Sequence, residues 1–261
     1  LLGVDATMTK GCAMRNWLFG CVVSLLLAPL PGAAQSLDAD QEDYIRANAI
    51  FFLYHELGHA LIDILKLPVF GREEDAADVM GVVLSETINP VEDTETIMLA
   101  AADNFAYMAE MAAQEGYELA FWDTHGLDKQ RFYTILCLFY GANPETRQKI
   151  ADEQGLPADR QATCPAEFEL AEQSWGPVLD DIKSAGRGDW LHLSVANKPS
   201  SEAEDVLLDA VTIEVGILNE VLDPGQSLDL VFGNCGEANA YYDPSDQRIV
   251  ICTELAGLFS D

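Results

Sequence analysis

Residues 48–68 read NAIFFLYHELGHALIDILKLP and carry the clearest helix signal in the chain. The stretch is rich in Ala, Leu, Ile and Phe, has no internal proline and ends at Pro68, which cannot continue a helix. Residues four apart are neighbours on a helix, so we expect His55 and His59 on one face with Glu56 beside them. This pattern predicts two metal-binding imidazoles with an adjacent general base; the alternative is two histidines that merely share a helix face.

A catalytic zinc usually has three protein ligands and one open position, so a third ligand is needed. The candidates are His125, His192 and the acidic group GREEDAAD at 71–78. Glu74 and Asp78 stand four apart and share a helix face, and an Asp there can accept the second ring N–H of a metal-bound histidine. We therefore predict Glu74 as the third ligand and Asp78 as the residue that accepts a hydrogen bond from a metal-bound histidine. We expect His192 to face solvent. The alternative is that these acidic residues only favour a helix N-terminus.

The combination of HELGH at 55–59 with the E-x-x-x-D pattern at 74–78 resembles the gluzincin branch of zinc metallopeptidases. In that branch a Glu on a second helix completes the HExxH site. Longer stretches are similar to a bacterial metallopeptidase family of the DUF4344 type, which is exported and has no assigned substrate. These stretches are 54–78, 125–141 and 235–255.

The resemblance implies a zincin-like α+β fold and one Zn²⁺ held by His55, His59 and Glu74. It also implies hydrolysis of a peptide or protein substrate, with Glu56 as the general base for a zinc-activated water. Three alternatives remain open on the sequence alone. They are a zinc-binding but inactive envelope protein that holds a partner, a helical protein without metal, and zinc hydrolysis of a non-peptide bond.

A second likeness concerns the NAYY segment, Asn239, Ala240, Tyr241 and Tyr242. It is similar to the edge strand that holds the substrate backbone in thermolysin-like enzymes, although there the segment precedes the HExxH helix. An equivalent role requires the C-terminal hairpin to fold back beside that helix and bind an extended peptide along its edge. The alternative is a plain structural hairpin.

The reaction also needs a donor for the developing oxyanion. His125, Tyr241 and Tyr242 are the candidates. Because no spacing directs His125 to the metal, the alternative for that residue is a surface or helix-capping histidine.

The segment from Met14, MRNWLFGCVVSLLLAPLPGAAQS, has the three zones of a secretory signal peptide. We predict cleavage near Ala34 and export to the periplasm or the medium. The alternative is a retained anchor, but the apolar run is too short to span a bilayer. We therefore expect no stable membrane anchor and assign residues 1–34 to the signal peptide and the residues upstream of it.

The chain is strongly acidic, with 14 basic and 44 acidic residues and a net charge of −30. Residues 35–261 keep 12 basic and 43 acidic residues, so the charge hardly changes after cleavage. Nucleic-acid binding needs clusters of Lys and Arg, and anionic lipid surfaces attract the same residues. The composition therefore excludes nucleic acid as a partner and disfavours anionic membranes.

Four cysteines follow the predicted cleavage site: Cys137, Cys164, Cys235 and Cys252. An even number in an exported chain suggests two disulfides, for which three pairings exist. We favour Cys137–Cys164 and Cys235–Cys252, because each closes a short loop within one region. Free buried thiols are the alternative.

Two regions follow the predicted signal peptide. Residues 35–184 read as helical, with further helices at 73–86, 93–114, 128–141 and 165–182. After a linker at 183–189, residues 185–261 read as an α/β region that packs on the HELGH helix. This region has strands at 190–195, 228–232 and 248–252, a helix at 201–222 and a hairpin that turns at 243–246. We therefore expect an α+β fold, helical first, with a small C-terminal sheet.

Overall fold

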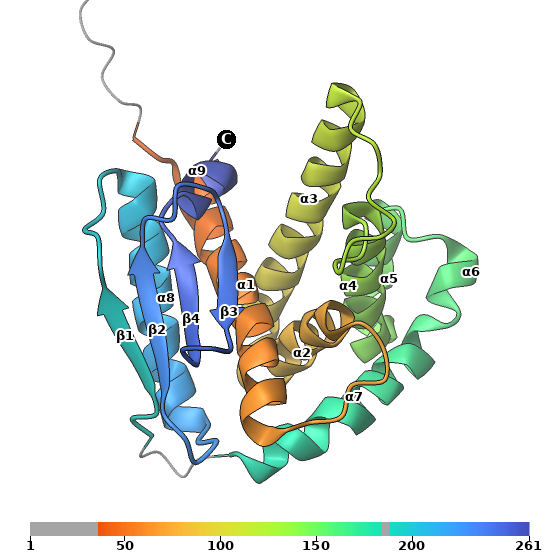
Figure 1. Cartoon of the computed structure of the whole chain (residues 1–261). Coiled ribbons are helices and arrows are strands. Elements are labelled where there is room, and N and C mark those ends of the chain that lie inside the picture. The colour runs from red at the N-terminus through yellow and green to blue at the C-terminus, as the bar shows by residue number, and fades with distance from the viewer. Residues whose placement is uncertain (1–35, 184–187, 261) are drawn as a thin grey trace, which may run out of the picture. The chain divides into compact units, whose positions relative to one another are not determined.

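Helices form most of the computed structural model, which describes residues 36–183 and 188–260 (Figure 1). Seven helices come first: α1 (Ala39–Leu65), α2 (Glu73–Ile88), α3 (Val91–Glu115), α4 (Asp128–Ala142), α5 (Pro144–Glu153), α6 (Ala158–Gln161) and α7 (Cys164–Asp181). The rest of the described chain forms β1 (Leu191–Val195), α8 (Glu202–Val221), β2 (Leu228–Gly233), β3 (Ala240–Asp243), β4 (Arg248–Cys252) and α9 (Leu255–Ser260). The architecture is thus α+β, with a small sheet that follows a helical region.

Helix α1 is the centre of this arrangement. It starts at a capping box, in which Asp38 accepts from the Gln41 amide and the Gln41 side chain accepts from the Asp38 amide. It ends at Lys66, whose φ of 55° is left-handed, two residues before Pro68. Most residues between positions 45 and 64 are buried, and α1 contacts α2, α3, α8, α9 and β3. A helix that is apolar on nearly all sides belongs in the core, so the histidines of HELGH are buried.

The sheet has the strand order β1-β2-β4-β3. Strands β1, β2 and β4 are parallel, and β3 pairs antiparallel with β4 at the edge (Figure 1). Helix α8 connects β1 to β2 and contacts both β1 and α1. Strands β3 and β4 also contact α1, so the edge of the sheet lies beside the HELGH helix.

The predicted helices, the strands and the turn at 243–246 are all present. Helices α5, α6 and α9 were not predicted from the sequence. Helix α5 buries only Arg147 and Ala151, so it has no apolar stripe that a periodicity search recognises. The region division at 184 remains a prediction, and most of the predicted linker lies outside the described residues.

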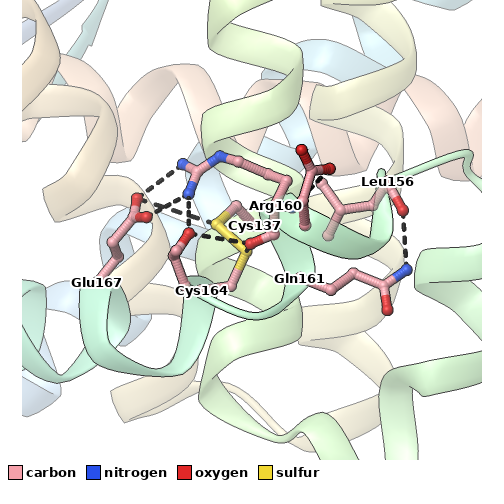
Figure 2. Close-up of a disulfide and its surroundings, with 8 residues drawn as sticks. Cys137, Leu156, Arg160, Gln161, Cys164 and Glu167 are labelled. Atoms are coloured by element: carbon pink, nitrogen blue, oxygen red, sulfur yellow. Dashed lines mark hydrogen bonds and ion pairs between the residues drawn. A yellow bond between two sulfur atoms is a disulfide. The ribbon is translucent and has the colours of Figure 1, made fainter.

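Both favoured disulfides are present. Cys137–Cys164 joins α4 to the first residue of α7, and Figure 2 shows it beside Arg160 and Glu167, where Arg160 donates to both carboxylate oxygens of Glu167. Cys235–Cys252 joins the β2–β3 connection to the last residue of β4. The second bridge therefore holds the segment that leads into the edge strand.

The predicted signal peptide lies outside the described residues. Among the helices that the structure does describe, none is both long and apolar enough to cross a membrane.

Candidate metal centre

The site begins with the close packing of α1 against α2. Gly58 makes this packing possible, because a Cβ atom at that position would lie 3.0 Å from the Cα of Ala77 and 3.2 Å from its Cβ. The short connection at 66–72 then returns the chain so that the first turn of α2 faces HELGH. Glu74, on that turn, thereby reaches both histidines of α1.

Three atoms meet at this point: Nε2 of His55, Nε2 of His59 and Oε2 of Glu74. Each of the three separations between them is 3.2 Å. A tetrahedral zinc with ligand bonds of about 2.0 Å keeps its ligand atoms about 3.3 Å apart. The two rings are buried, and the Glu74 side chain is 18% exposed. The spacing and the chemistry of these donors therefore fit one zinc ion.

Carboxylates on the far side of each ring determine which nitrogen carries the proton. Nδ1 of His55 lies 2.9 Å from Oδ1 of Asp78, and Nδ1 of His59 lies 2.8 Å from Oε1 of Glu73. A carboxylate only accepts, so each Nδ1 donates and each Nε2 of a neutral ring presents its lone pair to the other ligand atoms. With both rings neutral, three acceptors converge, and either a bound cation or a proton on an imidazole offsets their repulsion.

The electrostatics agree with this arrangement. Burial disfavours the charged form of His55, but its hydrogen bonds to Asp78 and Glu74 outweigh burial and raise its pKa to about 9. The pKa of His59 is also raised, since its bonds to Glu74 and Glu73 and the charge of Glu56 together outweigh burial and the charge of His55. The pKa of Glu74 lies far below its usual range, because bonds to His125, His55 and His59 outweigh its burial. The pocket thus stabilises positive charge at the place where a metal fits.

Asp78 is itself held by a residue that was not predicted from the sequence. Arg131, on α4, donates from Nε to Oδ2 of Asp78 at 2.8 Å and from Nη2 to Oδ1 at 2.6 Å. Burial raises the pKa of Asp78, but the charge and hydrogen bonds of Arg131 and the contact with His55 together outweigh burial and hold that pKa far below its usual range. A guanidinium among the buried apolar residues of α4 is the signal that could have found it, because buried arginines are almost always paired.

Replacing Arg131 with Met should remove the guanidinium charge from the buried Asp78 carboxylate and leave it the hydrogen bond from His55. We expect a loss of about 3–5 kcal/mol in the free energy of unfolding, and metal affinity lower by about 10–100-fold because His55 loses its fixed orientation. Urea unfolding and metal titration measure the two effects. Arg46→Met removes a guanidinium from surface ion pairs with Glu42 and Asp209 and should cost about 1 kcal/mol or less. Equal losses in the two variants would contradict this account.

Glu56 lies next to the ligand atoms and is only 5% exposed. Burial raises its pKa, while the charges of His55 and His59 and a backbone hydrogen bond from Tyr242 oppose this effect. Glu56 lines two cavities, of about 640 and 820 Å³, that share the lining residues His125, Asn239 and Ala240. The carboxylate therefore lies where a bound molecule that spans both cavities must pass.

His125 lies at this centre, whereas His192 does not. Nε2 of His125 is 2.9 Å from Oε2 of Glu74, and the side chain is 50% exposed. Together with His55 and Glu74 it forms a group that is able to hold a metal ion. The ring of His192 is exposed on β1 and lies 2.9 Å from the carbonyl of Asp189. Only the fold brings the 116–127 connection to the metal centre, so no spacing in the sequence signals the contact of His125.

The NAYY segment lies along the second cavity. Cys252 donates to the carbonyl of Asn239 at 3.0 Å, so this pair is hydrogen-bonded across β3 and β4. Bonded and non-bonded pairs alternate in an antiparallel ladder, which directs the N–H and C=O groups of Ala240 and Tyr242 to the open edge. The Tyr242 hydroxyl donates to Asp63 at 2.7 Å, and Tyr241 is partly exposed. The hairpin therefore folds back beside α1, as the likeness required.

Comparison with known proteins gives one family. The model of the DUF4344 family, described as "Putative metallopeptidase", matches residues 30–179 and 194–260. No curated protein and no solved structure matches the chain.

Proposed function

This chain belongs to the DUF4344 metallopeptidase family, and from that membership we propose that it is an exported zinc peptidase with a zincin-like fold. The observation that carries the proposal is the mutual 3.2 Å spacing of Nε2 of His55, Nε2 of His59 and Oε2 of Glu74, with Glu56 beside them. Such a set would hold one zinc and leave a fourth position open. When bound, the metal supplies the Lewis acidity that activates water and polarises a carbonyl.

Glu56 is the general base of this proposal. Its burial favours the neutral form and so raises its affinity for a proton, which is what a base needs near neutral pH. It takes a proton from the attacking water and passes it to the nitrogen of the departing amine. The Tyr242 backbone, on β3, favours the charged form of this carboxylate.

The open edge of β3 is the proposed binding site for the substrate backbone. The free N–H and C=O groups of Ala240 lie in the wall of both cavities, so an extended peptide that adds to this edge passes Glu56. The disulfide between Cys235 and Cys252 restrains the segment before this strand. Asn239 lies at the start of the same edge and lines both cavities.

The donor for the oxyanion comes from the same wall. His125, at hydrogen-bond distance from Glu74, and Tyr241, in the second cavity, are the candidates that the geometry favours. The hydroxyl of Tyr242 is already bonded to Asp63, which leaves Tyr242 the weakest of the three candidates for the oxyanion donor.

Export to the periplasm or the medium is also part of the proposal. The two disulfides are compatible with an oxidising compartment, and the predicted signal peptide supplies the route.

Elemental analysis and a cleavage assay test this proposal together. We expect one zinc per purified chain. We also expect the chain to cleave a random peptide mixture, as monitored by mass spectrometry, and a chelator to abolish this cleavage. Adding zinc back should restore the cleavage. One zinc without cleavage of any peptide would instead indicate the inactive binding protein, and a chain without zinc in metal-replete medium would reject the centre itself.

A further inference from the structure

The two halves of the cleft differ in chemistry. The 640 Å³ cavity between α1, α3 and α9 is walled by large apolar side chains, namely Phe52, Phe105, Met108, Leu119, Leu255 and Leu258. Along α3 the wall is built from Ala109, Ala112 and Ala113, whose small side chains leave the space open. The 820 Å³ cavity on the other side of Glu56 is lined by polar residues such as Asp63, Lys66 and Arg72. A large side chain is therefore accommodated on the α3 side.

Unpaired negative charge surrounds the apolar cavity. Glu110, on α3, and Glu118, in the following connection, line it and are exposed, and neither forms a salt bridge with another described residue. Of the basic residues in the same lining, Arg131 is paired with Asp78, whereas Lys129 lies over the ring of Phe132 at 4.8 Å and keeps its charge, which those of Glu110 and Glu118 outnumber. The net charge of −30 adds to this field. The entrance therefore attracts cations and repels acidic chains.

We infer that the substrates of the peptidase proposed above are cationic, amphipathic peptides, bound extended along β3 with a bulky apolar side chain in the α3 cavity and Lys or Arg beside it. This inference rests on the proposed function. An extended peptide turns alternate side chains to opposite sides. One apolar residue then enters the cavity while its neighbours remain at the rim, near Glu110 and Glu118.

Matched peptides test the inference. One set varies the anchoring residue between Phe, Leu and Ala, and another varies the flanking residues between Lys, Gln and Glu. We expect kcat/KM about 10-fold higher for Lys than for Gln flanks at low salt, with the advantage falling as salt screens the rim charges. We also expect Phe or Leu to exceed Ala by at least about 10-fold. Equal rates across both sets would overturn the inference and leave the proposed function standing.

Variants locate the two preferences. Glu110→Gln with Glu118→Gln should remove most of the Lys preference and spare cleavage of neutral peptides. Glu169→Gln with Glu172→Gln removes the same charge from exposed positions of α7 that do not line either cavity, and should leave the preference intact. Ala112→Leu should slow cleavage of Phe peptides about 10-fold or more while sparing Ala peptides. The new leucine would fill part of the cavity, which only the large Phe side chain needs.

A binding measurement separates this inference from the catalytic proposal. Trp122 is 77% exposed, and its neighbours Ala120 and Asp123 line the cavity, whereas Trp175 and Trp190 are buried. In Glu56→Gln, the emission of Trp122 should change on addition of the Lys-flanked Phe peptide and stay constant with the Glu-flanked peptide. If wild type cleaves nothing, the proposed function fails, yet this titration still decides the inference. Equal responses to the two peptides would reject it.

Discussion

Glu56→Gln is expected to lower kcat by about 10²- to 10⁴-fold while one zinc per chain is retained. Gln keeps the size of the side chain but has no basicity, so it cannot take the proton from the attacking water. The proposed metal ligands are other side chains, at Nε2 of His55, Nε2 of His59 and Oε2 of Glu74, so metal content should not change. Steady-state kinetics on one peptide, with elemental analysis of the same preparation, measures both quantities.

Glu214→Gln is the matched control for Glu56→Gln. Glu214 is a buried glutamate whose pKa burial also raises, and it accepts a hydrogen bond from Tyr54. It lies on α8 and lines neither cavity of the cleft. Its amide replacement should leave kcat unchanged. A similar loss in both variants would mean that Glu56→Gln acts through the fold, and an active Glu56→Gln enzyme would remove Glu56 from its proposed role.

Glu74→Gln is expected to weaken zinc binding by about 100-fold or more, since even loss of a residue that only supports a ligand costs about 10–100-fold. The substitution replaces an anionic oxygen, 3.2 Å from both imidazole nitrogens, with a neutral amide. Competition with a chromophoric chelator measures the affinity. Thermal unfolding gives a second readout, because a ligand at about 100 times its Kd stabilises the folded chain by about 2.7 kcal/mol. The variant should lose most of that gain.

The neighbours of Glu74 provide graded controls. Glu73→Gln removes the charge that orients His59 through Nδ1 and should cost about 10–100-fold in zinc affinity. Asp75→Asn removes the carboxylate on the other sequence neighbour of Glu74, which among the described residues pairs only with the exposed Arg72, and should cost nothing measurable. The same loss in all three variants would point to the general acidity of this turn instead of a defined ligand set.

Local patterns along the chain predicted a large part of this molecule. An apolar run that ends at a proline predicts α1, and a spacing of four predicts that His55 and His59 share a face. The same reasoning pairs Glu74 with Asp78 and places both opposite the histidines. The local disulfide pairings and the C-terminal hairpin were predicted as well. All of these features depend on residues close in sequence, where helix and strand geometry leave few alternatives.

The rest of the centre comes from contacts between distant segments. Arg131 lies 53 residues after Asp78, and the edge strand at Ala240 lies far from Glu56 in sequence, so no local spacing relates them. Glu73 and His125 reach the site only because α1 packs on α2 at Gly58 and the 116–127 connection folds over α2. Residue types and local periodicity therefore predict the proposed ligands, whereas packing between distant segments decides which charges contact them and which strand lies beside the HELGH helix.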